Sequence, residues 1–198
     1  MIRVWDPVVR VFHWSLVAAF AIAFLSADEW DDVHIWAGYS VAALVAMRLI
    51  WGLVGSRYAL FSQFLRGPAA VLSYLSQMRQ GTEPRHLGHN PAGAAMIVAL
   101  LLTLSVTAST GWLISDGTYS LGLGTVEQTN GDGGHRKKSK SATVELVKDL
   151  HELSANLMLI LIAAHLGGVI LASRRHHENL ARSMLTGLKR KPAPGDIA

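Results

Sequence analysis

The sequence has no cysteine and few charged residues. Only 16% of its 198 residues are Asp, Glu, Lys or Arg, against about 25% in an average soluble domain. The absence of cysteine excludes disulfides, thiolate zinc sites, iron–sulfur clusters and haem attached through a Cys-x-x-Cys-His motif. The low charge, with 51% hydrophobic residues and a mean hydropathy of +0.30, argues against a soluble enzyme and against a disordered chain. A bound metal or cofactor must therefore be held by His, Met or oxygen ligands.

Four apolar stretches have the length of membrane-spanning helices. They cover about residues 8–25, 35–54, 91–114 and 153–172, and each is near the roughly 20 residues that cross a hydrocarbon core of about 30 Å. The charged, aromatic residues around His13 argue against a cleaved signal peptide in the first stretch. We therefore expect an all-α integral membrane protein in which residues 1–198 form one four-helix bundle.

The loop charges predict the orientation of the bundle. The loop after the first stretch is acidic, whereas Lys and Arg gather at the N-terminus, in the loop over residues 55–90 and in the tail over residues 173–198. The positive-inside rule then places both termini and the 55–90 loop in the cytoplasm. Apolar residues within the 55–90 loop predict a short amphipathic helix at the cytoplasmic interface. The net charge of +4 does not indicate nucleic-acid binding, because the basic residues lie beside apolar runs.

The loop over about residues 116–145 is Gly-rich and is expected to be flexible and external. Its basic residues run against the positive-inside rule (Arg136, Lys137, Lys138, Lys140 and Lys148). They suggest either a docking site for an anionic partner or a solvated linker.

Four histidines match one another in depth across the predicted membrane. His13 lies about one turn inside the first stretch, His34 opens the second, His151 opens the fourth, and His165 lies deep in the fourth. Fourteen residues separate the last two, which gives about 21 Å along a helix axis and places both side chains on one face. His13 is at the depth of His165, and His34 is at the depth of His151. Two separated bis-histidine sites of this kind suit two b-type haems.

Other interpretations of these histidines remain open. A single His at a membrane interface is commonly a polar cap, and this would account for His34 or His151 taken alone. Zinc is the rival cofactor, but zinc sites usually gather three or four ligands at one point. Arg48, which follows His34 by fourteen residues, and Arg10, one turn before His13, are candidates for the inner haem's propionates; simple anchoring at the interface is the alternative. His89 is a candidate helix cap, propionate contact or quinone contact.

The sequence resembles the bacterial cytochrome b561 family, which includes the cytochrome b subunits of nickel–iron hydrogenases. The matching features are short, but they follow one order and spacing along nearly the whole chain except the third loop. They are Val11–Phe12–His13–Trp14, His34 with Gly38, Arg57–Tyr58 with Phe61, Arg66–Gly67–Pro68, Gly88–His89–Asn90–Pro91 with Gly93, Thr110–Gly111, His151–Glu152, His165, Glu178–Asn179–Leu180, Ser183–Met184 and Thr186–Gly187–Leu188–Lys189. The resemblance implies a four-helix bundle that binds two haems b and moves electrons between quinone and another redox partner. It also implies that His13, His34, His151 and His165 are the axial ligands.

Three functions fit this resemblance. The first is an electron carrier between ubiquinone or menaquinone and a periplasmic redox protein such as a c-type cytochrome. The second is a self-contained quinone oxidoreductase that acts on a small molecule such as superoxide, and the third is the membrane anchor of a hydrogenase or dehydrogenase. A haem-free metal transporter is an alternative of a different class. Groups that could exchange protons with a quinone are present on both sides: His89, Arg10 and Arg85 inside, and Asp149 and Glu152 outside.

Overall fold

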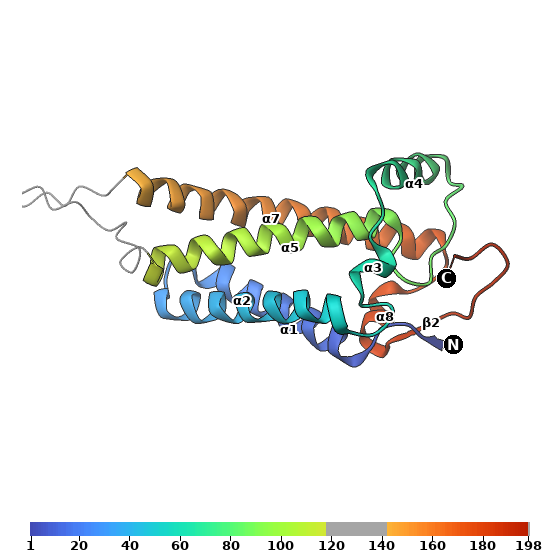
Figure 1. Cartoon of the computed structure of the whole chain (residues 1–198), viewed down its shortest axis with the longest axis horizontal. Helices are drawn as coiled ribbons and strands as arrows, with labels where there is room; N and C mark the ends of the chain where they lie inside the picture. Colours follow the sequence, from blue (N-terminus) through green and yellow to red (C-terminus); the bar gives the residue numbers. More distant parts are fainter. Residues whose placement is uncertain (118–141, 198) are drawn as a thin grey trace, which may run out of the picture.

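Four long helices run side by side along the longest axis of the molecule (Figure 1). The structure is a computed structural model, and it describes residues 1–117 and 142–197. The long helices are α1 (Pro7–Ser26), α2 (Asp31–Val54), α5 (Pro91–Trp112) and α7 (Ala142–Arg175), and a π-helical turn over Leu113–Gly117 continues α5. All four are long and apolar enough to cross a membrane. The expected all-α, four-helix membrane fold is confirmed.

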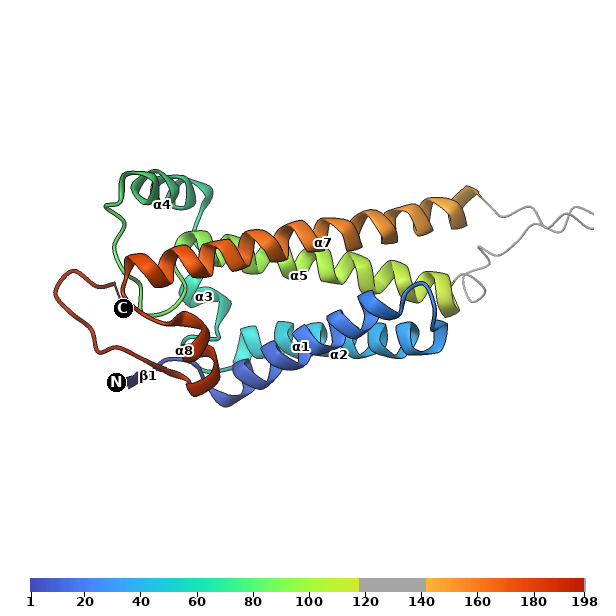
Figure 2. The ribbon, with the colours of Figure 1, turned by 180° about the vertical axis from the view of Figure 1, so that it is seen from behind.

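The two ends of the bundle differ in construction. One end carries both termini and all the short elements (Figures 1 and 2), and we call it the terminal end. These elements are α3 (Phe61–Phe64), α4 (Pro68–Gln80), α8 (Leu180–Thr186), β1 (Ile2–Arg3) and β2 (Leu188–Lys189). The two strands pair antiparallel, with Ile2 opposite Lys189. The other end, which we call the loop end, carries the turn between α1 and α2.

Side-chain caps fix where two of the spanning helices begin. The Asp6 carboxylate accepts a hydrogen bond from the Val9 amide at 2.8 Å, and the Asn90 side chain accepts one from the Gly93 amide at 2.7 Å. In each case a proline follows the cap. Proline costs nothing at the first helical position, because its missing N–H would have had no partner within the helix. Both caps lie at the terminal end, so α1 and α5 enter the bundle from the same side.

Helix α7 is longer than its apolar core predicts. We expected a helix from about residue 153 and a loop to residue 145, but α7 begins at Ala142, so the expected end of the loop is wrong. Glu145, Lys148 and Asp149 end the apolar run, yet such residues cost a helix little and remain in it. His151 therefore lies well inside α7 rather than at its start, and His34 lies one turn inside α2. The basic residues Arg136, Lys137, Lys138 and Lys140 fall outside the described residues.

The loop over residues 55–90 contains the short helix that its apolar pattern predicts. Helix α4 ends at Gly81, which takes a φ of 73° and so closes the helix in a left-handed turn. Tyr74 is buried on one side of α4, against His86, whereas Leu72 is exposed. Whether α4 rests on the membrane interface stays a prediction.

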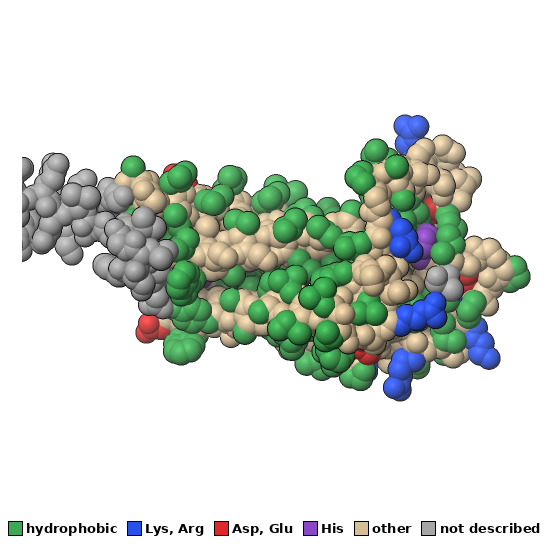
Figure 3. Space-filling view, in the orientation of Figure 1, with side chains coloured by type: hydrophobic (Ala, Val, Ile, Leu, Met, Phe, Trp, Pro, Cys, Tyr) green, Lys and Arg blue, Asp and Glu red, His purple; other side chains and the backbone are tan. Residues whose placement is uncertain are grey.

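The bundle has a small internal core and an apolar outer surface. Its buried cluster takes one or two side chains from each long helix (Ala19, Val41, Val45, Leu104 and Met158). Most other apolar side chains cover the outside of the bundle, as the space-filling view shows (Figure 3). Water would penalise so much exposed apolar area, whereas lipid chains would not. The chain is therefore a multi-pass membrane protein.

Helix α7 stands apart from α1 and α2. Helix α1 packs along α2, α2 packs on α5, and α5 packs along α7, whereas neither α1 nor α2 packs closely against α7 within the described residues. The spanning windows of α1 and α7 are also the least buried of the four, at 11% and 6%. The interior of the bundle is thus incompletely filled by protein on the side where these helices face each other.

Candidate functional site

Two histidine pairs bridge the helices that do not pack together. His13 of α1 and His165 of α7 approach with ring centroids 6.5 Å apart. His34 of α2 and His151 of α7 approach with ring centroids 6.0 Å apart. The structure therefore brings together the same two pairs that depth and helical spacing predict. We call them the inner pair, nearer the terminal end, and the outer pair, nearer the loop end.

The ring separations suit one metal ion between each pair. A metal–imidazole bond is about 2.0–2.1 Å long, and the ring centroid lies roughly 1.1 Å behind the nitrogen. Two imidazoles on opposite sides of one metal would then have centroids about 6.3 Å apart, close to both observed values. Within the described residues, no group of three or more His, Cys, Asp or Glu side chains is arranged to hold a metal ion. Histidines that come in separated pairs disfavour zinc, which usually takes three or four protein ligands at one point.

Backbone carbonyls fix the tautomers of the outer pair. His34 Nδ1 lies 2.8 Å from the Ala23 carbonyl oxygen, and His151 Nδ1 lies 2.9 Å from the Thr107 carbonyl oxygen. A carbonyl only accepts, so each Nδ1 must carry the proton and donate it. Each Nε2 then keeps a free lone pair, which is the state a metal ligand needs. These contacts orient both rings before any metal binds.

The surroundings of His151 also limit how its ring can move. Thr110 Oγ1 lies 3.1 Å from His151 Nδ1, and a Cβ built on Gly111 would lie 3.0 Å from His151 Cε1. At Gly38, one turn after His34, an added Cβ would meet nothing within 4 Å. The outer pair thus combines a tightly held ligand ring on α7 with open space on α2, where a planar group could lie.

The inner pair is less constrained by hydrogen bonds. His13 Nδ1 is buried and has no hydrogen-bond partner among the described residues. The His13 ring contacts Trp14 edge to face, with centroids 5.2 Å apart. A buried ring nitrogen without a partner is costly. The missing partner is consistent with a group that belongs between α1 and α7.

Arg48 places a positive charge inside α2 near the terminal end. Its side chain is buried, with only 4% of the residue exposed, and Nη2 donates to the Ala59 carbonyl at 3.1 Å. The guanidinium carbon lies 4.8 Å from the centre of the Phe61 ring. Nη1 is buried and has no partner in the part of the chain that the structure describes. An unmatched donor on a buried cation indicates a site for an anionic oxygen.

Two further buried donors lie at this end of the bundle. Arg10 Nη1 donates to the Leu185 carbonyl at 2.6 Å, but Arg10 Nε has no partner among residues 1–117 and 142–197. His89 lies between the rings of Trp5 and Phe64, each 4.6 Å away, and its buried Nδ1 is likewise unpaired in this region. The unpaired donors of Arg10 and Arg48, and the protonated nitrogen of His89, can bind carboxylate or carbonyl oxygens.

The electrostatics keep His89 neutral. Burial, followed by the positive charges of Arg48 and Lys189, lowers the pKa of the His89 imidazole to about 3. The ring is therefore uncharged near pH 7 and can donate from one nitrogen while accepting at the other. Charge on Arg48 or on His165 lowers the pKa of His89, so both residues are close enough to act on its imidazole. His89 thus belongs to the surroundings of the inner pair.

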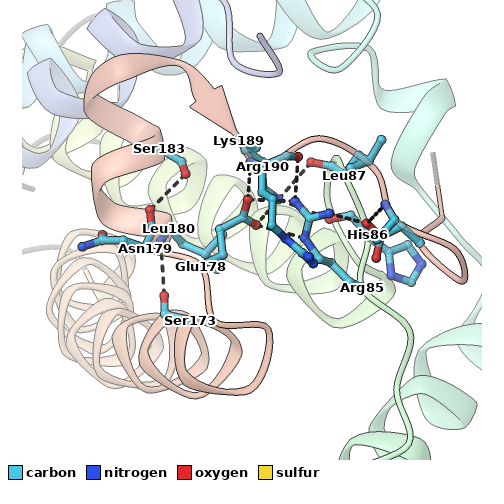
Figure 4. Close-up of polar contacts among 12 residues, drawn as sticks. Arg85, His86, Leu87, Ser173, Glu178, Asn179, Leu180, Ser183, Lys189 and Arg190 are labelled. Carbon is cyan, nitrogen blue, oxygen red and sulfur yellow. Dashed lines mark hydrogen bonds and ion pairs between the residues drawn. The ribbon is translucent and has the colours of Figure 1, made fainter. Parts of the chain in front are cut away.

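Arg85 is occupied by a buried ion-pair network. Its guanidinium bonds Glu178 Oε1 at 2.8 Å and Asp196 Oδ2 at 2.5 Å, and Lys189 Nζ lies 3.3 Å from Glu178 Oε2 (Figure 4). Lys189 also donates to the carbonyls of His86 and Leu87. This network ties the C-terminal tail to the segment that leads to His89. Arg85 is therefore a poorer candidate for a quinone contact than His89.

Several supporting residues were not assigned from the sequence. Trp5 and Phe64 enclose His89, Thr107 and Thr110 orient His151, and Lys189 holds the segment before α5. Thr107 and Thr110 could have been suspected from the sequence. A run of Ser and Thr inside an apolar helix needs hydrogen-bond partners nearby, and a histidine on a neighbouring helix is one. The contacts of His89 with Trp5 and Phe64, and of Lys189 with the segment before α5, could not be suspected, because they join residues far apart in the chain.

Comparison with known proteins identifies the family of the chain. The family model for prokaryotic cytochrome b561 matches residues 4–187. No curated protein and no solved structure matches the chain. The match covers all four long helices and both histidine pairs. The chain belongs to the prokaryotic cytochrome b561 family and is a transmembrane haem b electron-transfer protein.

Proposed function

We propose that this cytochrome binds two haems b, one at each histidine pair, and transfers electrons between the quinone pool and a periplasmic redox partner such as a c-type cytochrome. The observation that carries the proposal is the pairing of His13 with His165 and of His34 with His151, at ring separations of 6.5 and 6.0 Å. When bound, haem supplies a one-electron couple at each site. The ligand positions on α7 are about 21 Å apart along the helix, so the two sites lie near opposite membrane surfaces.

The protein's part in this function is to hold, orient and separate the two sites. The four imidazoles would hold the two haems, one imidazole on each side of each haem, and the bound haems would then supply electron transfer rather than oxygen chemistry. The Ala23 and Thr107 carbonyls hold the outer rings with Nε2 free. Arg10 and Arg48 would bind the inner propionates through their unpaired donors. The His89 imidazole, whose Nδ1 is unpaired among the described residues, would contact a propionate or a quinone carbonyl.

The charge distribution supports the proposed orientation. In the space-filling view, Lys and Arg gather at the terminal end (Figure 3). Asp28, Glu29, Asp31 and Asp32 lie at the loop end. The positive-inside rule then puts both termini in the cytoplasm and the outer pair near the periplasm. An electron passing between the two haems would cross most of the inner membrane.

Electron flow through the reconstituted full-length protein tests this proposal. We expect two haems b per chain by pyridine haemochrome assay, rapid haem reduction by a short-chain ubiquinol or menaquinol without oxygen, and re-oxidation by an added c-type cytochrome. In His34→Ala and in His165→Ala, electron transfer from quinol to the c-type cytochrome should stop. Only the variant that keeps the quinone-side haem should still be reduced by quinol. Haem that quinol cannot reduce, or wild-type relay rates in both variants, would exclude the function.

Replacing Arg48 with Gln should lower the reduction potential of the inner haem. A positive charge near the iron favours the reduced form, because that form carries one more electron. Removing the charge should therefore lower the midpoint by an amount on the order of tens of millivolts. Spectroscopic redox titration measures this shift, and the outer midpoint should stay unchanged.

The matched control is Arg57→Gln, which removes an equal charge at the terminal end. The Arg57 guanidinium lies over Tyr58, 5.7 Å from its ring centre, and it is not among the buried donors. Its removal should leave both midpoints near their original values. Unchanged midpoints in Arg48→Gln would assign Arg48 to anchoring rather than to a propionate.

A further inference from the structure

A groove at the terminal end lies between α8 and the last turns of α7. It has a volume of about 470 Å³, and its lining includes Val169, Ile170, Arg174, His177 and Ala181. Ile170 and Arg174 are four residues apart in α7 and so share one face of that helix, whereas His177 lies two residues beyond its end. The groove therefore changes along its length from apolar side chains to the Arg174 cation and the His177 imidazole.

The apolar part of the groove belongs to the membrane-spanning segment. Val169 and Ile170 lie within α7, and Ile170 is 51% exposed in the protein alone. Surface of this kind at spanning depth faces lipid chains. An occupant of the groove therefore needs an apolar portion that lies along α7.

The cationic part of the groove is unneutralised. Arg174 and His177 make no hydrogen bond or ion pair with any described residue. By contrast, the adjacent Arg175 is paired with Glu83 at 2.8 Å. Glu178 also lines the groove, but Arg85, Lys189 and the Arg190 amide occupy its carboxylate. The free Arg174 cation therefore favours an anion, to which the His177 imidazole can add a hydrogen bond.

The backbone fixes His177 in this place. His177 lies in the turn after α7 and has a φ of 49°, a left-handed conformation that is uncommon outside glycine. The Glu178 amide donates to the Ser173 carbonyl at 3.1 Å and closes the turn. The chain then turns into α8, where the Leu180 amide donates to Ser173 Oγ at 3.3 Å. This closed turn holds the groove between α7 and α8.

We propose that this α7–α8 groove binds the headgroup of an anionic phospholipid, with its acyl chain along Val169 and Ile170. The phosphate matches Arg174 and His177, and the acyl chain matches the apolar floor. A quinone headgroup carries no charge to match Arg174, and a free phosphate has no apolar portion. Phosphate binding by Arg is strong when several donors converge on one group. The lipid lies in the leaflet at the terminal end and fastens α8 against α7.

Native mass spectrometry of the delipidated full-length protein tests the proposal. The probes are phosphatidylglycerol, phosphatidylcholine, inorganic phosphate and a short-chain ubiquinone, each added to the same detergent. We expect phosphatidylglycerol to bind at least about tenfold more tightly than phosphatidylcholine. Arg174→Gln/His177→Gln should lose most of that preference, and Arg174→Lys/His177→Lys should retain it. Haem content, measured in each variant, shows that the fold is intact.

The matched control is Arg190→Gln/Lys191→Gln, which neutralises two exposed residues of the tail outside the groove. It should bind phosphatidylglycerol as the wild type does. Equal loss in the control, or no preference for phosphatidylglycerol in the wild type, would overturn the proposal. Equally tight binding of inorganic phosphate would show a soluble-anion site instead. Displacement of phosphatidylglycerol by the ubiquinone would assign the groove to quinone.

Discussion

His165→Ala is expected to remove one of the two proposed haems and leave the other in place. His165 faces His13 across 6.5 Å and takes no part in the outer pair. Without it, the inner site keeps a single imidazole, and iron held from one side binds far less firmly. The haem content of purified protein should fall from about two to about one per chain. The remaining haem should keep the low-spin spectrum of bis-histidine ligation.

The reciprocal variants separate the two sites. His13→Ala should resemble His165→Ala, whereas His34→Ala and His151→Ala should each lose the outer haem. His176→Ala is the matched control, because this histidine lies just beyond α7 and belongs to neither pair. Retention of both haems with unaltered spectra in His165→Ala would show that the pairing is wrong. Loss of haem in the control would indicate a general failure to fold.

Arg85→Met is expected to destabilise the terminal end strongly. The Arg85 side chain is only 4% exposed, and it neutralises Glu178 and Asp196, which are 6% and 8% exposed. Removing one partner of such a network leaves buried charge without compensation, at a cost of about 3–5 kcal/mol. For a chain of this size that corresponds to a melting temperature lower by roughly ten degrees. Tryptophan fluorescence of the protein in detergent measures the change.

Two companion variants test the cause of this loss. Arg85→Met/Glu178→Met removes a positive and a negative charge together, so it should recover part of the stability. Arg175→Met breaks the pair with Glu83, but that arginine side chain is 31% exposed. Its loss should cost no more than about 1 kcal/mol, because solvent screens such pairs. Equal losses in Arg85→Met and Arg175→Met would contradict a special role for burial.

The pH dependence of stability should be weaker in Arg85→Met than in the wild type. Burial alone would raise the pKa of Glu178, but hydrogen bonds from Arg85 and the Arg190 amide, with the Lys189 charge, lower it below 4.5. The resulting stabilisation is present above pH 4.5 and is lost as pH falls through the folded pKa. In Arg85→Met the contribution of Arg85 is lost, while those of the Arg190 amide and Lys189 remain. The stability lost on acidification through pH 4.5, measured by the same fluorescence melt, should therefore be smaller in the variant.

The membrane helices and the histidine pairs follow from short-range rules of the sequence. The length of an apolar run predicts a span, and helical periodicity predicts that His151 and His165 share a face. The first turns of α7 were missed because Glu145, Lys148 and Asp149 interrupt the apolar run without interrupting the helix. The helix that contains the fourth span therefore begins at Ala142 and ends at Arg175, beyond the apolar run on both sides.

The tail network could not be predicted, because it depends on contacts between distant residues. Arg85 is separated from Glu178 by 93 positions and from Asp196 by 111. Charged residues in a tail are usually solvated, and nothing local distinguishes these. The enclosure of His89 by Trp5 and Phe64 likewise joins the N-terminus, α3 and the segment before α5.

The position of α7 has a consequence for biogenesis. It is the last of the four long helices in chain order, and it supplies one histidine to each pair. A growing chain that has inserted α1, α2 and α5 holds His13 and His34 but not their partners. In the proposed arrangement, neither pair could close around a haem until α7 has left the ribosome and entered the membrane. Cofactor capture at both pairs would therefore follow synthesis of the last helix, and a chain truncated before α7 would assemble neither site.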